Sequence, residues 1–162
     1  MASREISNFQ SLLALVCFLA VTFSVAALGS AATIPEIPGW YAGLAKPTFN
    51  PPNWIFGPVW SLLYALMAVA AWRVWRERGL VHRAMLLFAI QLLLNLAWSW
   101  LFFGAHRPDL AVIEVALLDA AVLATLILFW RIDRIAGTLL IPYLAWISFA
   151  TVLNASIVRL NG

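Results

Sequence analysis

Five long apolar segments constrain the fold of this chain more than any other feature of its sequence. They lie at about residues 9–30, 53–75, 84–103, 109–130 and 135–158. Each has about the 20 residues that an α-helix needs to cross a hydrocarbon core of about 30 Å. A helix also satisfies its own backbone N–H and C=O groups, which lipid cannot do. We therefore predict an all-α fold, in which residues 1–162 form one integral membrane domain of five transmembrane helices.

The composition excludes several classes of function. The chain is 64% hydrophobic and 10% charged, far from the balance of a soluble globular protein. The net charge is +3, but lysine and arginine lie mainly at the ends of the predicted helices, so no nucleic-acid partner is expected. Cys17 is the only cysteine, and His82 and His106 both fall in predicted turns. We therefore expect no metal site and no required cofactor, and we expect no pair of histidines holding a haem inside the membrane.

The first apolar segment has two interpretations. Arg4, the apolar run from Leu12 to Leu28 and the small residues after it resemble a cleaved signal peptide. The run is longer than the apolar region of about 7–15 residues in such peptides, and Glu5 weakens the basic start. We predict a retained transmembrane helix and leave cleavage as the alternative.

The distribution of positive charge predicts the orientation. With five crossings, the N-terminus and the second and fourth connections share one side of the membrane. That side holds Arg4, Arg73, Arg76, Arg78, Arg83, Arg131 and Arg134, and the other side holds Lys46, Arg107 and Arg159. The positive-inside rule then places the N-terminus in the cytoplasm.

Residues 31–52 form the only long connection that the sequence predicts. They include Pro35, Pro38, Pro47, Pro51 and Pro52. Proline fixes φ and removes a backbone donor, so we expect a stiff loop and not a continued helix. A stiff loop with several aromatic residues can serve as an ordered lid.

Counting along the predicted helices brings several polar and aromatic side chains to one depth. At about 1.5 Å per residue, Trp60, Asn95, Trp98 and Trp146 all fall in the half of the membrane beneath this loop. Rings at this depth do not fit the aromatic belt at the membrane surface. An aromatic pocket with a few amides suits a large, flat, mostly apolar ligand, whereas interior packing explains the same residues without a ligand.

Two features of the fourth helix have open interpretations. Asp119 lies near its middle, where an ionisable group is either functional or a protonated acid that is hydrogen-bonded across the bundle. Ala116, Ala120 and Ala124 have the spacing of small residues that lets helices approach closely. Their partner is either a neighbouring helix or a second subunit.

Three ordered motifs resemble those of one known family. They are GWYAGLAKPTFNPPNWIFGPVW at 39–60, NLAWSWLFFG at 95–104 and PYLAWISFATVLN at 142–154. Together they resemble the TspO/MBR family, which comprises tryptophan-rich sensory proteins and translocator proteins, also called peripheral-type benzodiazepine receptors. The resemblance covers residues 38–161 and implies a five-helix bundle, often a homodimer in the lipid bilayer, with porphyrins such as protoporphyrin IX or haem as ligands. Some members bind cholesterol or benzodiazepine-type ligands.

The positions of these motifs assign the family's ligand-binding residues to residues of this chain. By resemblance, the ligand-binding residues are Tyr41, Pro51, Trp60, Tyr64, Asn95, Trp98, Trp146, Ala150 and Leu153. The chain departs from the family at Phe49, where tryptophan is usual. It also has Ala155 and Ser156 where the family's sterol-binding pattern has a tyrosine, which argues against sterol binding.

The resemblance implies binding of porphyrins or other tetrapyrroles for sensing or transport. Two alternatives belong to other classes of function. One is an enzyme that degrades porphyrin with light and oxygen, with Trp60 and Trp146 as the candidate catalytic rings. The other is a proton-coupled transporter that uses Asp119.

Overall fold

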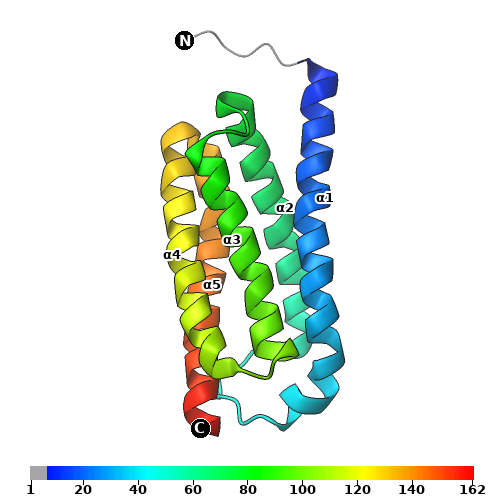
Figure 1. The fold of residues 1–162 in the computed structure, drawn as a ribbon, viewed down its shortest axis with the longest axis vertical. Coiled ribbons are helices and arrows are strands. Elements are labelled where there is room, and N and C mark those ends of the chain that lie inside the picture. The colour runs from blue at the N-terminus through cyan, green and yellow to red at the C-terminus, as the bar shows by residue number, and fades with distance from the viewer. Residues whose placement is uncertain (1–6) are drawn as a thin grey trace.

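The protein is a bundle of five long helices, seen in a computed structural model that describes residues 7–162 (Figure 1). The predicted Arg4 and Glu5 features lie outside the described residues. The helices are α1 (Asn8–Thr33), α2 (Asn53–Arg78), α3 (Arg83–Ser99), α4 (Pro108–Ile132) and α5 (Arg134–Asn161). Three short segments, η1 (Ile34–Glu36), η2 (Ile37–Tyr41) and η3 (Trp100–Gly104), extend α1 and α3. All five long helices are long and apolar enough to cross a membrane, which confirms the predicted fold class.

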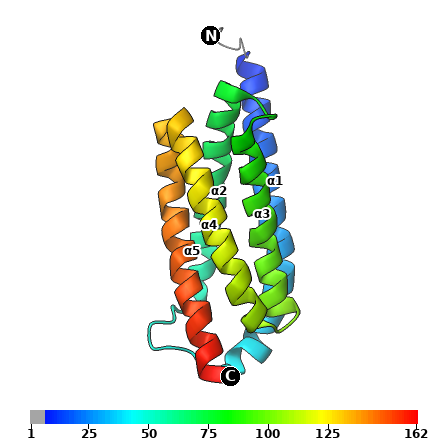
Figure 2. The same cartoon turned by 60° about the vertical axis from the view of Figure 1, so that its left-hand side comes forward.

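Successive helices run antiparallel and close into a ring. Helix α1 contacts α2 and α3, α4 contacts α3 and α5, and α2 contacts α5, so that the order around the bundle is α1, α2, α5, α4, α3. The α2–α3 and α4–α5 turns lie at the end where α1 begins, and the C-terminus lies at the other end (Figures 1 and 2). We call these the N-terminal end and the C-terminal end of the bundle.

The predicted loop over residues 31–52 is wrong in its first half. Helix α1 continues to Thr33 and passes through η1 and η2, so the apolar span reaches Tyr41. Pro35 and Pro38 do not break this path because each lies in the first turn of its short segment. A first-turn residue needs no backbone N–H group, so proline is tolerated there. The stretch without helical structure is limited to residues 44–52.

The N-terminal half of the bundle is closely packed around small side chains. Ala70, Ala71, Ala84 and Ala136 are fully buried there, and the rings of Phe88 and Phe129 stack with centroids 5.9 Å apart. Small residues let the helix backbones approach closely. Helices α4 and α5 approach closely at Gly137 of α5, where an added Cβ would lie 2.7 Å from Cα of Trp130 in α4.

An ion pair ties α2 to the α4–α5 turn. Arg73 Nε lies 2.7 Å from Asp133 Oδ2, and Asp133 Oδ1 caps α5 by accepting the N–H groups of Ile135 and Ala136 at 2.8 and 3.2 Å. Burial acts to raise the pKa of Asp133, but the hydrogen bonds from Arg73 and the two N–H groups outweigh burial and hold this pKa below its usual range.

The regularly spaced alanines of α4 do not form a buried contact with another helix of the described chain. Ala116 and Ala120 are exposed, and Ala124 is half-buried. The buried face of α4 instead carries larger residues, among them Leu118, Val122 and Phe129.

We expect Gly137→Ala to destabilise the bundle by about 1–3 kcal/mol, because the methyl group would push α4 and α5 apart. The midpoint of thermal unfolding in detergent measures this loss. Gly43→Ala is the control, since a Cβ at Gly43 meets no atom within 4 Å. Equal midpoints for the two variants would contradict the close approach of the two helices.

We also expect stability to depend on the charge of Asp133. A folded-state pKa below the unfolded value of about 3.9 adds stability above about pH 4, and this stability is lost as the pH falls through the folded-state pKa. Asp133→Asn keeps a capping oxygen but loses the charge. The variant should melt below the wild type at pH 7, and the gap should shrink at pH 3. A gap that is the same at both pH values would argue against the ion pair.

Candidate functional site

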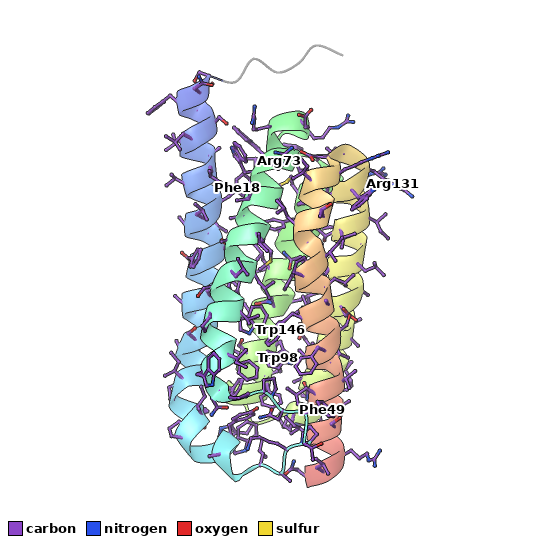
Figure 3. The ribbon with its side chains drawn as sticks, turned by 180° about the vertical axis from the view of Figure 1, so that it is seen from behind. Phe18, Phe49, Arg73, Trp98, Arg131 and Trp146 are labelled. Carbon is purple, nitrogen blue, oxygen red and sulfur yellow. The ribbon has the colours of Figure 1, made fainter. Side chains whose placement is uncertain are left out.

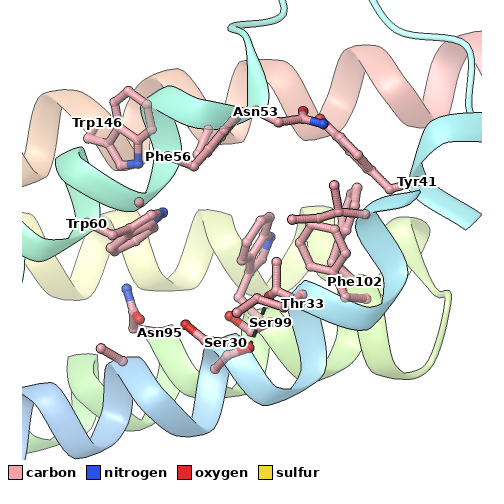
Figure 4. A pocket seen from close by; sticks show the side chains of 18 of the residues that line it. Ser30, Thr33, Tyr41, Asn53, Phe56, Trp60, Asn95, Ser99, Phe102 and Trp146 are labelled. Atoms are coloured by element: carbon pink, nitrogen blue, oxygen red, sulfur yellow. Dashed lines mark hydrogen bonds between the residues drawn. The ribbon is translucent and has the colours of Figure 1, made fainter. Parts of the chain in front are cut away.

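A cavity of about 460 Å³ lies within the C-terminal half of the bundle (Figure 4). It is lined by residues of α1, η1, η2, α2, α3, η3 and α5, while α4 contributes none. The volume lies within the range of about 300–1,000 Å³ that is typical of small-molecule sites. On the α1 and α2 sides, lining residues such as Ser30, Trp54 and Ser61 are exposed, so the cavity opens outward between these two helices.

The structure brings most of the predicted site residues together around this cavity. Those that line it are Tyr41, Trp60, Tyr64, Asn95, Trp98, Trp146, Ala150 and Leu153. Pro51 is not among the lining residues. It lies in the connection before α2, where its carbonyl accepts a hydrogen bond from Asn50 Nδ2 at 3.1 Å.

A chain of hydrogen bonds forms the inner end of the cavity. Tyr64 of α2 donates its hydroxyl to Asn95 Oδ1 of α3, and Asn95 Nδ2 donates to Tyr143 Oη of α5 at 3.0 Å. Tyr143 in turn donates to Gln91 Oε1 at 2.8 Å. All four side chains are buried. The chain joins three helices and satisfies polar groups that would be costly to leave unpaired in a membrane.

A second polar contact joins α3, α4 and α5. Trp98 Nε1 donates to Asn154 Oδ1 at 3.1 Å, and Asn154 Nδ2 donates to the carbonyl of Pro108 at 3.0 Å. This arrangement fixes the indole of Trp98 at the cavity wall and holds it beside Phe102, whose ring stacks on it at 5.3 Å and 26°.

Aromatic rings make up much of the remaining wall. Trp146 contacts Phe56 and Phe149 with ring centroids 5.7 and 5.6 Å apart, and Trp60 contacts Tyr64 at 5.5 Å. Figure 4 shows Trp60 and Trp146 at the same end of the cavity, with Phe102 at the other. A flat ligand would therefore meet ring faces and edges along the length of the cavity.

Sequence reasoning missed the wall that α1 supplies. Phe23, Ala26, Gly29, Ser30 and Thr33 of this helix line the cavity. The approach of α1 to α3 is close, since a Cβ on Gly29 would lie 3.1 Å from Ser99 Oγ. The run of small and hydroxyl residues from Gly29 to Thr33 was the available signal, because such residues mark close helix contacts in membranes.

The segments η1 and η2 and residues 44–52 lie at the C-terminal end of the bundle, and we call them the cover. One side of the cover is held by a contact between η1, η2 and the α3–α4 turn. His106 Nε2 lies 2.8 Å from Glu36 Oε2, and the His106 ring stacks on Trp40 at 4.4 Å and 12°. The backbone of His106 has φ 52°, a conformation that non-glycine residues adopt uncommonly and that often accompanies function. We call Glu36, Trp40 and His106 the latch. It holds the segment that lines the cavity through Ile34, Ile37 and Tyr41.

The other side of the cover is held by the end of α5. Asn161 accepts the N–H group of Ala45 and donates to its carbonyl, both at 2.9 Å. Phe49 packs edge-on against Phe149, with ring centroids 6.2 Å apart. The connection therefore has defined contacts at both ends, as a lid requires.

Two acidic residues of α4 lie away from the cavity lining. Asp119 accepts the hydroxyl of Ser148 in α5 at 3.0 and 3.2 Å. Glu114 is buried, and neither of its carboxyl oxygens has a hydrogen-bond partner in the described chain. Residues 7–162 contain no group of three or more histidine, cysteine, aspartate or glutamate residues placed to hold a metal ion.

Comparison with known proteins shows the family of this chain. The model of the TspO/MBR family matches residues 16–160, a range that includes every residue lining the cavity. The chain belongs to the TspO/MBR family. It is 38% identical to the tryptophan-rich protein TspO of Chlorobaculum tepidum, over 94% of this chain and 98% of that protein.

Two further relatives of this chain have different names. The human translocator protein is 41% identical over 75% of both chains. The tryptophan-rich sensory protein of Cereibacter sphaeroides is 40% identical over 88% of this chain and 91% of its own length. The protein is therefore a multi-pass membrane protein of this family.

We expect loss of the latch to loosen the cover. In His106→Ala, hydrogen exchange at residues 34–43 should be about two- to tenfold faster, because an exposed hydrogen bond to Glu36 and one ring stack on Trp40 are together worth about 0.5–1.5 kcal/mol. His82→Ala, which alters the histidine at the opposite end of the bundle, is the matched control. Unchanged exchange at 34–43 in His106→Ala would show that the latch does not hold the cover.

Proposed function

We propose that this protein binds flat tetrapyrroles, such as protoporphyrin IX or haem, in the aromatic cavity for sensing or transport. The observation that carries the proposal is the cavity itself, a space of about 460 Å³ bordered by Trp60, Trp98, Trp146 and several phenylalanines. Ring faces and edges suit an extended aromatic macrocycle, since aromatic contacts add to the gain from buried area. The names of the relatives, sensory protein and translocator protein, are in line with a role of this kind.

The opening and the cover support a route for ligands. The cavity opens between α1 and α2 at exposed lining residues, while η1, η2 and residues 44–52 cover the C-terminal end of the bundle. An apolar ligand dissolved in the bilayer can therefore reach the cavity from the side. Sterols remain an unfavoured ligand class because of Ala155 and Ser156.

Orientation is part of the same proposal. Arg73 and Arg131 lie at the N-terminal end of the bundle, and Phe49 lies at the other (Figure 3). If the positive-inside rule holds in the host membrane, the arginine-rich end faces the cytoplasm and the covered cavity lies in the opposite leaflet.

A homodimer is proposed through the outer face of α4. Ala116 and Ala120 are exposed on this helix and have the spacing of small residues that supports close helix contacts. The cavity is lined without any residue of α4, so a dimer of this kind would leave the ligand site intact.

The two alternative functions gain unequal support. Trp60 and Trp146 both line the cavity, so light-dependent degradation of a bound porphyrin stays a prediction that absorbance under illumination would test. Asp119 does not line the cavity, and its carboxylate accepts a hydrogen bond from Ser148. The cavity therefore gives no support to proton coupling through Asp119.

We expect Trp60→Leu and Trp146→Leu to weaken protoporphyrin binding by about three- to tenfold, because each removes one aromatic wall worth about 0.5–1.5 kcal/mol. Quenching of tryptophan fluorescence in detergent measures the affinity. Trp75→Leu is the control, since Trp75 packs against Phe18 in the N-terminal half. If Trp75→Leu weakened binding as much as the other two, the ligand site would lie elsewhere.

A further inference from the structure

The turn between α2 and α3 carries two large apolar side chains that the bundle does not cover. Leu80 is 63% exposed and Val81 is fully exposed, and we call these two residues the apolar pair. The α3–α4 turn, residues 105–107, and the α4–α5 turn, Asp133, have no large apolar side chain. Two adjacent exposed apolar side chains gain free energy from an apolar surface outside the described chain.

The shape of this turn is fixed at both of its ends. Gly79 has φ 73°, a conformation that favours glycine, and its N–H group donates to the carbonyl of Trp75 at 2.8 Å, which ends α2. His82 has an extended backbone, and its Nδ1 accepts the N–H group of Ala84 at 3.2 Å, which caps the start of α3. The outward position of the apolar pair is therefore a property of the fold.

Helix length places the turn at the boundary of the hydrocarbon core. Helix α3 and η3 together extend over 22 residues from Arg83 to Gly104. At about 1.5 Å per residue they span about 33 Å, close to the core thickness of about 30 Å. The turn lies directly before Arg83 at the N-terminal end of the bundle (Figure 1), so it falls among the lipid headgroups. At this depth an apolar side chain reaches the boundary between headgroups and acyl chains.

Basic side chains flank the apolar pair in the sequence. Arg76 and Arg78 lie in the last turn of α2, Arg83 is the first residue of α3, and all three are exposed. None of the three forms an ion pair with a described residue, although Glu77 lies between two of them. A guanidinium group presents its N–H groups as a fork that matches two phosphate oxygens. The three arginines are therefore suited to bind phosphate.

One of these arginines is already oriented by an indole ring. The guanidinium carbon of Arg76 lies over the ring of Trp72, 5.0 Å from its centre, and Trp72 Nε1 donates to the carbonyl of Ser11 in α1 at 2.9 Å. Stacking uses the face of the guanidinium group and leaves the N–H groups at its edge for other partners. Arg76 therefore loses less conformational freedom when it binds an anion.

The acidic residues at this end of the bundle do not neutralise it. Asp133 is engaged by Arg73, and Glu77 is the only other acidic residue at this end in the part of the chain that the structure describes. Arg131 (Figure 3) and Arg134 are also exposed and form no ion pair with a described residue. The resulting excess of positive charge complements an anionic surface.

We propose that the α2–α3 turn binds anionic phospholipid headgroups, with Arg76, Arg78 and Arg83 on the phosphate oxygens and the apolar pair at the acyl boundary. The inference goes beyond the proposed function, because this surface lies at the opposite end of the bundle from the cavity. A free anion would leave the apolar pair in water. A soluble protein partner would have to displace the headgroups that surround the turn.

The first test compares phosphatidylglycerol with phosphatidylcholine. Each lipid is titrated into the detergent-solubilised protein, and the rise of the thermal unfolding midpoint with lipid concentration gives the affinity. We expect phosphatidylglycerol to bind about tenfold more tightly, and this preference to decrease in about 0.5 M salt. Arg78→Gln combined with Arg83→Gln should weaken binding of phosphatidylglycerol about tenfold and leave phosphatidylcholine unchanged. Equal affinities of the wild type for the two lipids would overturn the inference.

Two controls separate the turn from net charge and from free anions. Arg107→Gln combined with Arg159→Gln removes the same charge at the C-terminal end of the bundle and should change the affinity for phosphatidylglycerol less than about twofold. An equal loss in both double variants would mean that net charge selects the lipid, and the inference would fail. Inorganic phosphate at the same concentration should leave the midpoint unchanged, and a rise equal to that with phosphatidylglycerol would also overturn the inference.

A fluorescent label tests the depth of the turn in a bilayer. Cys17 is the only cysteine, so Cys17→Ser combined with Val81→Cys can be labelled at one position, and Cys17→Ser combined with Gly162→Cys is the control. In vesicles that contain phosphatidylglycerol, the label at position 81 should be quenched more strongly by a quencher on the lipid chains than by a water-soluble one. The control should show the reverse order. If the water-soluble quencher reached both labels equally well, the turn would lie in water and the inference would be wrong.

Discussion

The pairing of buried polar groups is the constraint on which the rest of the structure depends. In the hydrocarbon region an unpaired amide or hydroxyl costs several kcal/mol, so these groups must find partners on neighbouring helices. Tyr64, Asn95, Tyr143 and Gln91 meet this requirement together and hold α2, α3 and α5 in one register. The same chain marks the inner limit of the cavity, because two of its members line that space.

Side-chain size differs between the closely packed N-terminal half of the bundle and the C-terminal half, which holds the cavity. In the N-terminal half, buried alanines and Gly137 allow the helix backbones to approach closely. In the C-terminal half, large rings contact one another in pairs, such as Trp98 with Phe102 and Trp146 with Phe56. Rings fixed by such pairs and by hydrogen bonds do not collapse into the space between them, so a cavity persists.

The sequence predicted some parts of this arrangement better than others, for physical reasons. Five helices follow from segment lengths alone, and a constant rise per residue was sufficient to bring Trp60, Asn95 and Trp146 to one depth. Periodicity did not distinguish a pocket from interior packing, because both place the same face inward. The wall from α1 was missed because this helix is apolar on all sides, so no face stood out. The extent of the first connection was misjudged because proline stops a helix only when its N–H group is needed.

The single-residue turn between α4 and α5 has a mechanical consequence. Only Asp133 separates the two helices, its side chain is fixed by Arg73, and the helices touch at backbone distance beside Gly137. This hairpin is the stiff side of the molecule. Helix α1, by contrast, buries only Thr22, Gly29 and Ala32 and is held at the far end by the latch. If a ligand binds in the cavity as proposed, displacement of α1 would break fewer buried contacts than separation of α4 from α5.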